Sequence, residues 1–245
     1  MKWARRLGIL FAVIYLLPAA ISLALWAGVE RPANWREADW RSSGLLPEAK
    51  AGGEAVVHVL AARVGGLKSA LAVHSWIVVK RRDEASYTRY EVVGWGTPLR
   101  RNAYAADGLW YSNKPAILAS LRGEAAGRAI AGIETAVADY PHARAGHYRI
   151  WPGPNSNSFV AHVLRRTPEL GAALPPTAVG KDWLAGGRLF SLDPDGRDFQ
   201  ASLFGYAGVS AGMRSGLELN LFGLVAGLDF ARPAIKLPGF GRIGF

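Results

Sequence analysis

An uncharged apolar segment from Leu7 to Gly28 is the feature that most constrains how this chain can fold. A helix of that length rises about 33 Å, which is enough to cross a hydrocarbon core of about 30 Å. Pro18 lies in its middle, and membrane helices tolerate proline better than soluble helices do. We therefore expect residues 1–28 to form a transmembrane anchor that binds membrane lipid through residues 7–28.

The charges that flank this segment predict its orientation. Lys2, Arg5 and Arg6 precede it, whereas the polar stretch that follows is close to neutral. By the positive-inside rule, the N-terminus is cytoplasmic and the remainder of the chain lies outside the cytoplasm. A cleaved signal peptide is the alternative, because residues 18–20 (PAA) are small, but the apolar run continues well past them, which favours an uncleaved anchor.

The rest of the chain has the composition of one compact domain. Half of its residues are hydrophobic, and the formal net charge of +10 is scattered along the sequence. We find no nucleic-acid-binding module and expect no nucleic-acid partner. The absence of Cys excludes disulfides, Cys-based zinc sites and a Cys nucleophile. Residues 29–53 are polar and predict a membrane-proximal linker, and residues 54–245 predict a globular domain.

Hydrophobic periodicity predicts an α+β fold in which an antiparallel sheet packs against helices. The strands are expected at 54–63, 71–79 and 87–95, and the helices at 116–138 and 156–166. Residues 199–245 are Gly-rich and apolar, with strand-like alternation at 217–221. Whether this C-terminal region completes the sheet or touches lipid is left open by the pattern.

Two segments could together carry chemistry. His74 lies on the apolar strand at 71–79, and Ser156 lies at the predicted start of the helix at 156–166. A helix start carries unpaired N–H groups and partial positive charge, which stabilise a developing anion. A neutral His could take the proton of such a Ser. The structural alternatives are a buried, hydrogen-bonded His74 and a Ser156 that only caps its helix.

These segments resemble the circularly permuted papain-like fold. In that fold a strand His precedes a nucleophilic Cys that begins a later helix, in a phrase close to Asn-Cys-Asn-x-Phe. Residues 155–159 read NSNSF, His74 matches the strand His, and residues 90–96 (YEVVGWG) resemble the following strand. Ser156 stands where that fold has Cys, which leaves a weaker nucleophile whose proton is harder to remove.

A second resemblance covers almost the whole chain. The phrases DWRSSGLLP, HSWIVVK, YEVVGWG, WPGPNSNSFVAH, PPTAVGKDW and KLPGFGRIGF occur in the order expected for a bacterial membrane-associated family of uncharacterised proteins, domain of unknown function 3750. The resemblance implies a bacterial membrane-associated protein. Together with the anchor and the orientation predicted above, we expect a bacterial inner-membrane protein with a single transmembrane pass and a periplasmic C-terminal domain. The resemblance supplies no activity.

Further residues are candidates around the proposed pair. Glu91 could orient His74 across the hairpin, although a one-residue slip in register would turn it away. Asn155 and Asn157 could bind a substrate amide or carboxyl group, or they could be turn residues. Lys181 and Asp182 could lie at the mouth of the site or form a surface salt bridge. The His residues lack metal-ligand spacing, so we expect no metal and no cofactor.

Two functions from different classes follow. The first is an envelope hydrolase or acyltransferase in which Ser156 is the nucleophile and His74 is the base. Its substrate would be an envelope peptide, a peptidoglycan stem or a lipid-linked acyl group. The second is a non-catalytic, membrane-tethered binding or structural protein that retains the fold.

Overall fold

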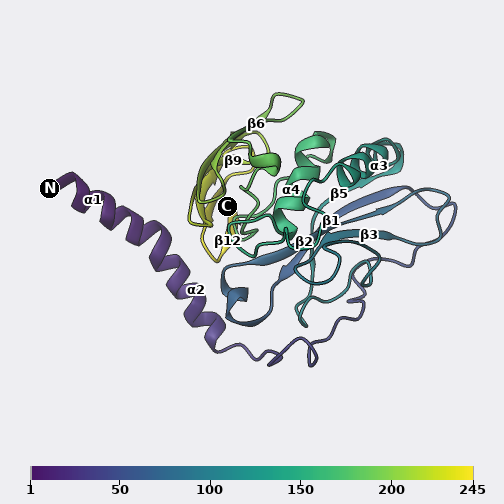
Figure 1. The fold of residues 1–245 in the computed structure, drawn as a ribbon, viewed down its shortest axis with the longest axis horizontal. Coiled ribbons are helices and arrows are strands. Elements are labelled where there is room, and N and C mark those ends of the chain that lie inside the picture. The colour runs from purple at the N-terminus through teal and green to yellow at the C-terminus, as the bar shows by residue number, and fades with distance from the viewer. Residues whose placement is uncertain (1, 245) are drawn as a thin grey trace.

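The computed structural model describes residues 2–244, and a long N-terminal helix extends from its globular part (Figure 1). The helix consists of α1 (Lys2–Phe11), a π-helical turn η1 (Ala12–Leu16) and α2 (Leu17–Ala27). Pro18 has no N–H and its ring crowds the carbonyl one turn earlier, which accounts for the π-turn directly before it. Among the described residues, Lys2–Ala27 is the one helix long and apolar enough to cross a membrane.

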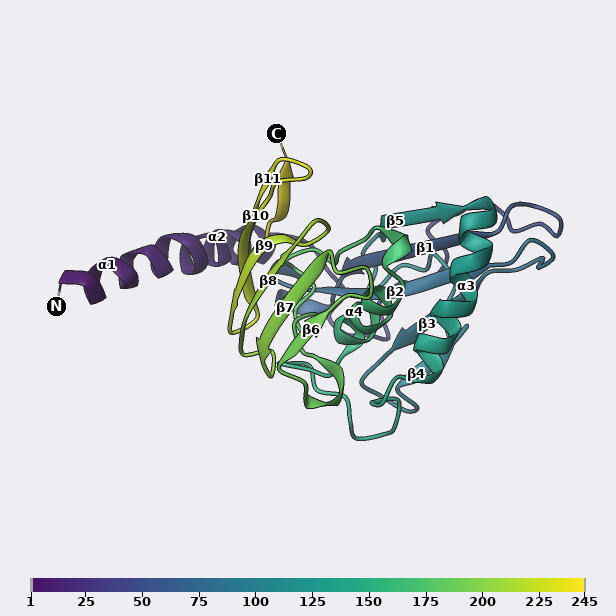
Figure 2. The same cartoon turned by 90° about the horizontal axis from the view of Figure 1, so that it is seen from above.

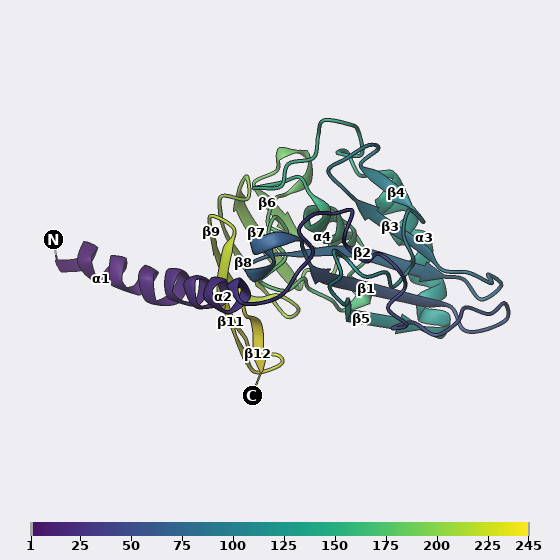
Figure 3. The same ribbon diagram turned by 90° about the horizontal axis from the view of Figure 1, so that it is seen from below.

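The segment at 29–53, predicted to be a linker, contains no helix or longer strand and runs across the globular part (Figure 3). Trp40 fixes it there, with ring centroids 5.3 Å from Tyr104 and 5.1 Å from Trp110. Ser42 adds a single β-bridge to Gly108. This linker covers the face of the first sheet that the helices leave free.

The first sheet is antiparallel, with the strand order β4-β3-β2-β1-β5. The predicted strands at 54–63, 71–79 and 87–95 are confirmed with ends that differ by a few residues. The central strand β2 is buried along its whole length, as its two apolar faces predicted. The five strands are β1 (Val56–Arg63), β2 (Val73–Lys80), β3 (Thr88–Val92), β4 (Leu99–Arg101) and β5 (Ala116–Arg122).

Two helices, α3 (Gly123–Ala138) and α4 (Ser156–Arg166), pack on one face of this sheet (Figure 2). Ile77 of β2, Ile133 of α3 and Phe159 of α4 are fully buried in the core between them. Short helical turns connect the larger elements: η2 (Gly66–Ala70), η3 (Pro168–Leu170) and η4 (Ala185–Gly187). The expected α+β class is therefore observed.

The helix predicted at 116–138 is wrong in its first third. Residues Ala116–Arg122 form β5, which pairs with β1, and α3 begins only at Gly123. Pairing with β1 satisfies backbone groups that would otherwise be exposed at a sheet edge, and this outweighs the helical spacing of Ile117 and Leu121. Gly123 has a φ of 65°, a left-handed conformation that favours glycine and separates strand from helix.

The C-terminal region, whose place in the fold the sequence left open, forms a second sheet of its own and does not extend the first one. Its strand order follows the chain, β12-β11-β10-β9-β8-β7-β6, so it is an antiparallel meander. The seven strands are β6 (Phe190–Leu192), β7 (Asp198–Leu203), β8 (Ala207–Gly212), β9 (Gly216–Leu221), β10 (Leu224–Asp229), β11 (Ala234–Leu237) and β12 (Gly241–Gly244).

The two faces of this second sheet differ sharply in polarity. The inner face packs against the rest of the globular part and carries buried polar side chains, which include Gln200, Glu218, Asn220 and Lys236. The outer face carries the alternate residues. Except for Gly241, every outward-facing residue in the described strands is Phe, Leu, Ile, Val or Ala. This is the reverse of a sheet that shows one face to water.

Candidate functional site

The candidate base, His74, is held by a buried carboxylate. Its Nε2 lies 2.9 Å from Oε2 of Glu91 on the neighbouring strand β3, and the same oxygen accepts a hydrogen bond of 2.8 Å from Arg89 Nη2. The register pairs Val78 with Arg89, so by strand alternation His74 and Glu91 lie on the same face of the sheet. The expected contact between Glu91 and His74 is confirmed.

Burial lowers the pKa of His74, and its contact with Glu91 only partly offsets this effect. Burial alone would raise the pKa of Glu91, but His74 and Arg89 outweigh it and the pKa of Glu91 is lowered. The dyad is therefore a neutral imidazole beside a carboxylate. Because a carboxylate only accepts hydrogen bonds, Nε2 must carry the imidazole proton, and Nδ1 has the free lone pair that a general base needs.

Aromatic rings fix the orientation of this dyad. Trp110 stacks on the His74 ring, with centroids 3.6 Å apart and planes 5° from parallel. The guanidinium of Arg89 lies over Trp76, 4.1 Å from the ring centroid. These contacts restrict rotation of the imidazole and keep water away from the Glu91 carboxylate, which is fully buried.

Ser156 lies in the first turn of α4, and its hydroxyl does not cap the helix. Asn155 is the N-cap, its Oδ1 accepts from the N–H groups of Asn157 and Ser158, and Ser158 completes a capping box. The alternative in which Ser156 caps the helix is therefore wrong, because the cap is the preceding residue, Asn155. The Ser156 hydroxyl instead contacts the half-buried Tyr148, and burial raises the pKa of Tyr148 to about 12.

The first turn of α4 also leaves one backbone donor unused. The N–H groups of Asn157, Ser158 and Phe159 all bond to Asn155. Within residues 2–244, the N–H of Ser156 has no hydrogen-bond partner. A free N–H at the positive end of a helix is the group that can stabilise an oxyanion formed at the neighbouring hydroxyl.

Asn155 and Asn157 hold this turn in place through their amide groups. Asn155 Nδ2 donates to the carbonyls of Ile150 and Val179 at 3.0 Å each. Asn157 Nδ2 donates to the carbonyls of Val73 and Val179, at 2.9 and 2.8 Å, and its Oδ1 accepts from Ser75 Oγ at 2.8 Å. These contacts position Ser156, and because both residues also line the pocket described below, their role in binding substrate stays a prediction.

His74 and Ser156 line the same pocket, which has a volume of about 720 Å³. It lies at the end of the first sheet where β2 begins, and the β9–β10 turn with Phe222 and Gly223 closes its other side. Its wall is rich in aromatic side chains and includes Trp95, Trp110, Tyr111, Tyr148 and Trp151. A pocket of this size and lining suits a ligand with a substantial apolar part.

The two residues reach this pocket from opposite sides of β2. Strand alternation turns His74 toward Trp76 and Trp110, whereas Ser75 faces α4 and bonds to Asn157. The bond from Asn157 to the Val73 carbonyl places the start of α4 beside the residue that precedes His74. In the described part of the chain, no direct hydrogen bond joins His74 to Ser156.

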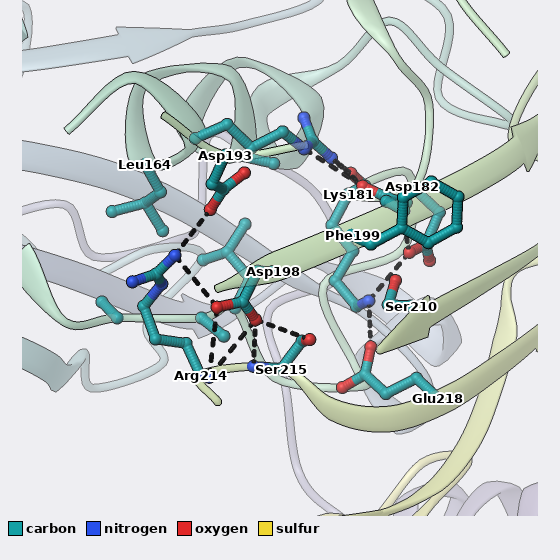
Figure 4. Close-up of a pocket in the computed structure, with 16 residues that line it drawn as sticks. Leu164, Lys181, Asp182, Asp193, Asp198, Phe199, Ser210, Arg214, Ser215 and Glu218 are labelled. Atoms are coloured by element: carbon teal, nitrogen blue, oxygen red, sulfur yellow. Dashed lines mark hydrogen bonds and ion pairs between the residues drawn. The ribbon is translucent and has the colours of Figure 1, made fainter. Parts of the chain in front are cut away.

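Lys181 and Asp182 lie in a different cluster, between α4 and the inner face of the second sheet (Figure 4). Lys181 Nζ contacts Asp182 Oδ1 at 2.9 Å and Glu218 Oε2 at 2.5 Å, and Lys236 Nζ contacts Glu218 Oε1 at 2.5 Å. Burial alone would lower the pKa of Lys181, but the two carboxylates raise it. The pair therefore joins the sheet to the core and does not line the pocket of His74 and Ser156.

Several residues of the site were not found from the sequence. Arg89 is two residues before Glu91 on one strand face, a spacing that could have indicated their ion pair. Trp110 and Tyr148 lie in loops, and neither periodicity nor a motif links them to His74 or Ser156. Among residues 2–244, no cluster of three or more His, Cys, Asp or Glu side chains could hold a metal ion.

The fold and the pocket define a class: an α+β protein with an N-terminal apolar helix, two antiparallel sheets and a pocket between them that is rich in aromatic side chains. Within that class, the chain belongs to the family described as "Protein of unknown function (DUF3750)", whose model matches residues 54–183. No curated protein and no solved structure matches the chain. The matched region contains His74, Glu91 and Ser156 and ends before the second sheet.

Proposed function

We propose that this protein is a membrane-anchored acyl hydrolase or acyltransferase, with Ser156 as nucleophile, His74 as general base and Glu91 as the group that orients the base. The observation that carries the proposal is the shared pocket, which is lined both by an oriented neutral imidazole and by a helix-start hydroxyl that is not used in capping. Ser–His–carboxylate sets of this kind are recognised by geometry and role and occur on unrelated folds.

The reaction can be written through these groups alone. The Ser156 hydroxyl gives its proton to His74 Nδ1 while its oxygen attacks the carbonyl carbon of an ester or amide. The free N–H of Ser156 stabilises the oxyanion, and His74 then protonates the leaving alcohol or amine. Water or an acceptor hydroxyl gives a proton to His74 and attacks the acyl-serine. The bond between the acyl carbon and the Ser156 oxygen then breaks, and His74 returns the proton to that oxygen as the product leaves.

The substrate class follows from the lining and the location of the pocket. Aromatic side chains surround it, and the apolar helix Lys2–Ala27 brings the globular part to a bilayer. A lipid-linked acyl group suits these surroundings better than the two other envelope substrates considered, a peptide or a peptidoglycan stem. The basic residues before Leu7 favour a cytoplasmic N-terminus, a bacterial inner-membrane anchor and a periplasmic globular part.

A second candidate function, ligand binding without turnover, is favoured by one specific observation. His74 and Ser156 approach the pocket from opposite sides of β2 and share no direct hydrogen bond. Serine is also a weaker nucleophile than cysteine at such a site. In this alternative the pocket holds a lipid or an acylated peptide and His74 only completes its wall.

A serine-directed fluorophosphonate probe, applied to the detergent-solubilised full-length protein, tests the proposal. We expect labelling of the wild type, loss of labelling in Ser156→Ala, and unchanged labelling in Ser86→Ala, a variant of an exposed serine in the β2–β3 turn. His74→Gln should slow the labelling at least tenfold. Equal labelling of the wild type and Ser156→Ala would end the catalytic proposal, and native mass spectrometry of retained lipid would then test the binding alternative.

A further inference from the structure

The outer face of the second sheet is apolar from edge to edge. The most exposed of its side chains belong to three different strands, β6, β7 and β9: Phe190 at 64%, Leu192 at 63%, Leu203 at 57% and Leu217 at 46%. A soluble sheet turns polar side chains to water and buries apolar ones, whereas here the polar side chains form the buried face. Alternation of this reversed kind is what lipid-facing strands of membrane proteins show.

The turns at the rim of this sheet add aromatic side chains. Phe222 and Phe230 are 66% and 68% exposed, and Phe204 is 47% exposed. Phe204 and Phe222 have φ values of 50° and 54°, which is an uncommon conformation for bulky residues. The turns thus hold large apolar rings outward in a backbone conformation that Gly or Asn adopts with less strain.

The apolar helix packs directly on this face. Tyr15 donates from its hydroxyl to the carbonyl of Leu219 in β9 at 3.0 Å. Ala226 of β10, an outward-facing residue paired with Leu219, is 7% exposed, and η1 contacts β10. The helix then projects beyond the sheet on that same side of the molecule (Figures 1 and 2). The surface that can enter a bilayer and the outer face of the sheet are therefore continuous.

We propose that the outer face of the second sheet lies on the membrane, with its apolar side chains in the hydrocarbon boundary of the leaflet from which the helix emerges. The depth is limited by backbone chemistry, because the edge strands β6 and β12 carry unpaired peptide groups that cannot enter hydrocarbon. The sheet is therefore an interfacial surface and does not span the bilayer. The proposal rests on the membrane anchor and is independent of catalysis.

Single-cysteine labelling tests this proposal without background labelling of other thiols, because the chain contains no Cys. An environment-sensitive fluorophore is attached to full-length Leu203→Cys and Phe190→Cys, reconstituted in vesicles of phosphatidylethanolamine and phosphatidylglycerol. Both positions lie on β6 and β7, two or three strands from β9, where the helix packs, and thus about 10–14 Å away. Glu124→Cys on α3 is the water-exposed control, and Val13→Cys reports on the helix.

The readout compares quenching by nitroxide-labelled lipid with quenching by iodide present on both sides of the bilayer. We expect lipid quenching at Leu203 and Phe190 to be several-fold stronger than at Glu124, and iodide quenching to be several-fold weaker. Lipid quenching at Val13 alone would overturn the sheet proposal and leave the anchor intact. Protection of the sheet positions from both quenchers would also overturn it, because the face would then be covered by protein.

Discussion

A substitution at Ser156 gives the most direct test of the catalytic proposal. In Ser156→Cys, the thiol is the only one in the chain, and its rate of alkylation by iodoacetamide reports its pKa. If the free lone pair of His74 and the helix start act on this atom, the thiol pKa falls below the ordinary value of about 8.5. We expect the pH midpoint of alkylation to lie at least about one unit lower.

His74→Gln in the Ser156→Cys background is the matched control for this measurement. It should return the midpoint most of the way toward that of a free thiol, whereas Glu91→Gln should have an intermediate effect. A midpoint that is the same with and without His74 would show that the imidazole does not reach position 156.

His162 makes the stability of the fold sensitive to acid. Burial, together with Arg165 and Arg166, lowers its pKa to about 4, and its Nε2 is buried without a partner in the described structure. The unfolded chain therefore binds a proton below about pH 6.5, but the folded chain does so only near pH 4. The stability contributed by neutral His162 is present above pH 6.5 and is lost as the pH falls.

We expect the free energy of unfolding to be about 1 to 2 kcal/mol lower at pH 5 than at pH 7 through this residue. Denaturant titrations in detergent at the two pH values measure the difference. His162→Gln should remove most of it, and the same change at the exposed His147 should not. A pH difference that survives in His162→Gln would assign the effect to other groups.

At the scale of single residues, the sequence was informative where a short local segment determines the position of a side chain. The NSNSF phrase placed Ser156 in the first turn of α4, and the hairpin after β2 placed Glu91 near His74. It was uninformative for Trp110 and Tyr148, because nothing local shows which strand a loop side chain will contact. The cluster around Lys181 and Asp182 was not found because the partners Glu218 of Lys181 and Gln200 of Asp182 are far away in the chain.

At the scale of elements, the capping box determines where Ser156 lies. Asn155→Ala removes the cap for two N–H groups and also the bonds from its amide to Ile150 and Val179. Loss of an N-cap costs about 1 kcal/mol, and the carbonyls left unpaired raise this to about 2 to 3 kcal/mol. Chemical denaturation measures the loss, and Asn155→Asp, which retains the capping oxygen, should lose less.

The errors of element prediction have one physical source, which is that sheet pairing is not local. Ala116–Arg122 carries a helical pattern but becomes a strand because β1 offers a free edge. In the C-terminal region only 217–221 stood out as a strand, although six further strands flank it. Their polarity is reversed and their turns contain Phe, so the usual cue of polar turns between strands is missing.

At the scale of the whole molecule, Glu218 joins the second sheet to the core. It is buried between Lys181 and Lys236, and its pKa is lowered: burial alone would raise it, but the two ammonium groups outweigh that effect. Glu218→Gln leaves two buried cations short of a counter-charge, and losing one partner of such a network costs about 3 to 5 kcal/mol. We expect a loss of that size in denaturant unfolding, with Glu124→Gln on the exposed face of α3 as an unaffected control.

Removal of residues 2–27 tests how the molecule as a whole interacts with membranes. If the outer face of the second sheet lies on lipid, the shortened chain still floats with vesicles in a density gradient, and Leu203→Glu together with Leu217→Glu abolishes flotation. A shortened chain that stays in the aqueous fraction and is monomeric without detergent would contradict this expectation. The double substitution in the full-length chain, which keeps its helix, is the control for folding.

The β9–β10 turn belongs both to the rim of the second sheet and to the wall of the pocket. Phe222 is 66% exposed and also lines the pocket beside Gly223. If the sheet lies on a leaflet as proposed, the entrance of the pocket that contains Ser156 and His74 is at the level of the acyl chains. A two-tailed amphiphile then enters the pocket by lateral diffusion from the bilayer past Phe222 and does not pass through water. Its concentration in the leaflet, not its aqueous solubility, sets the occupancy of the site.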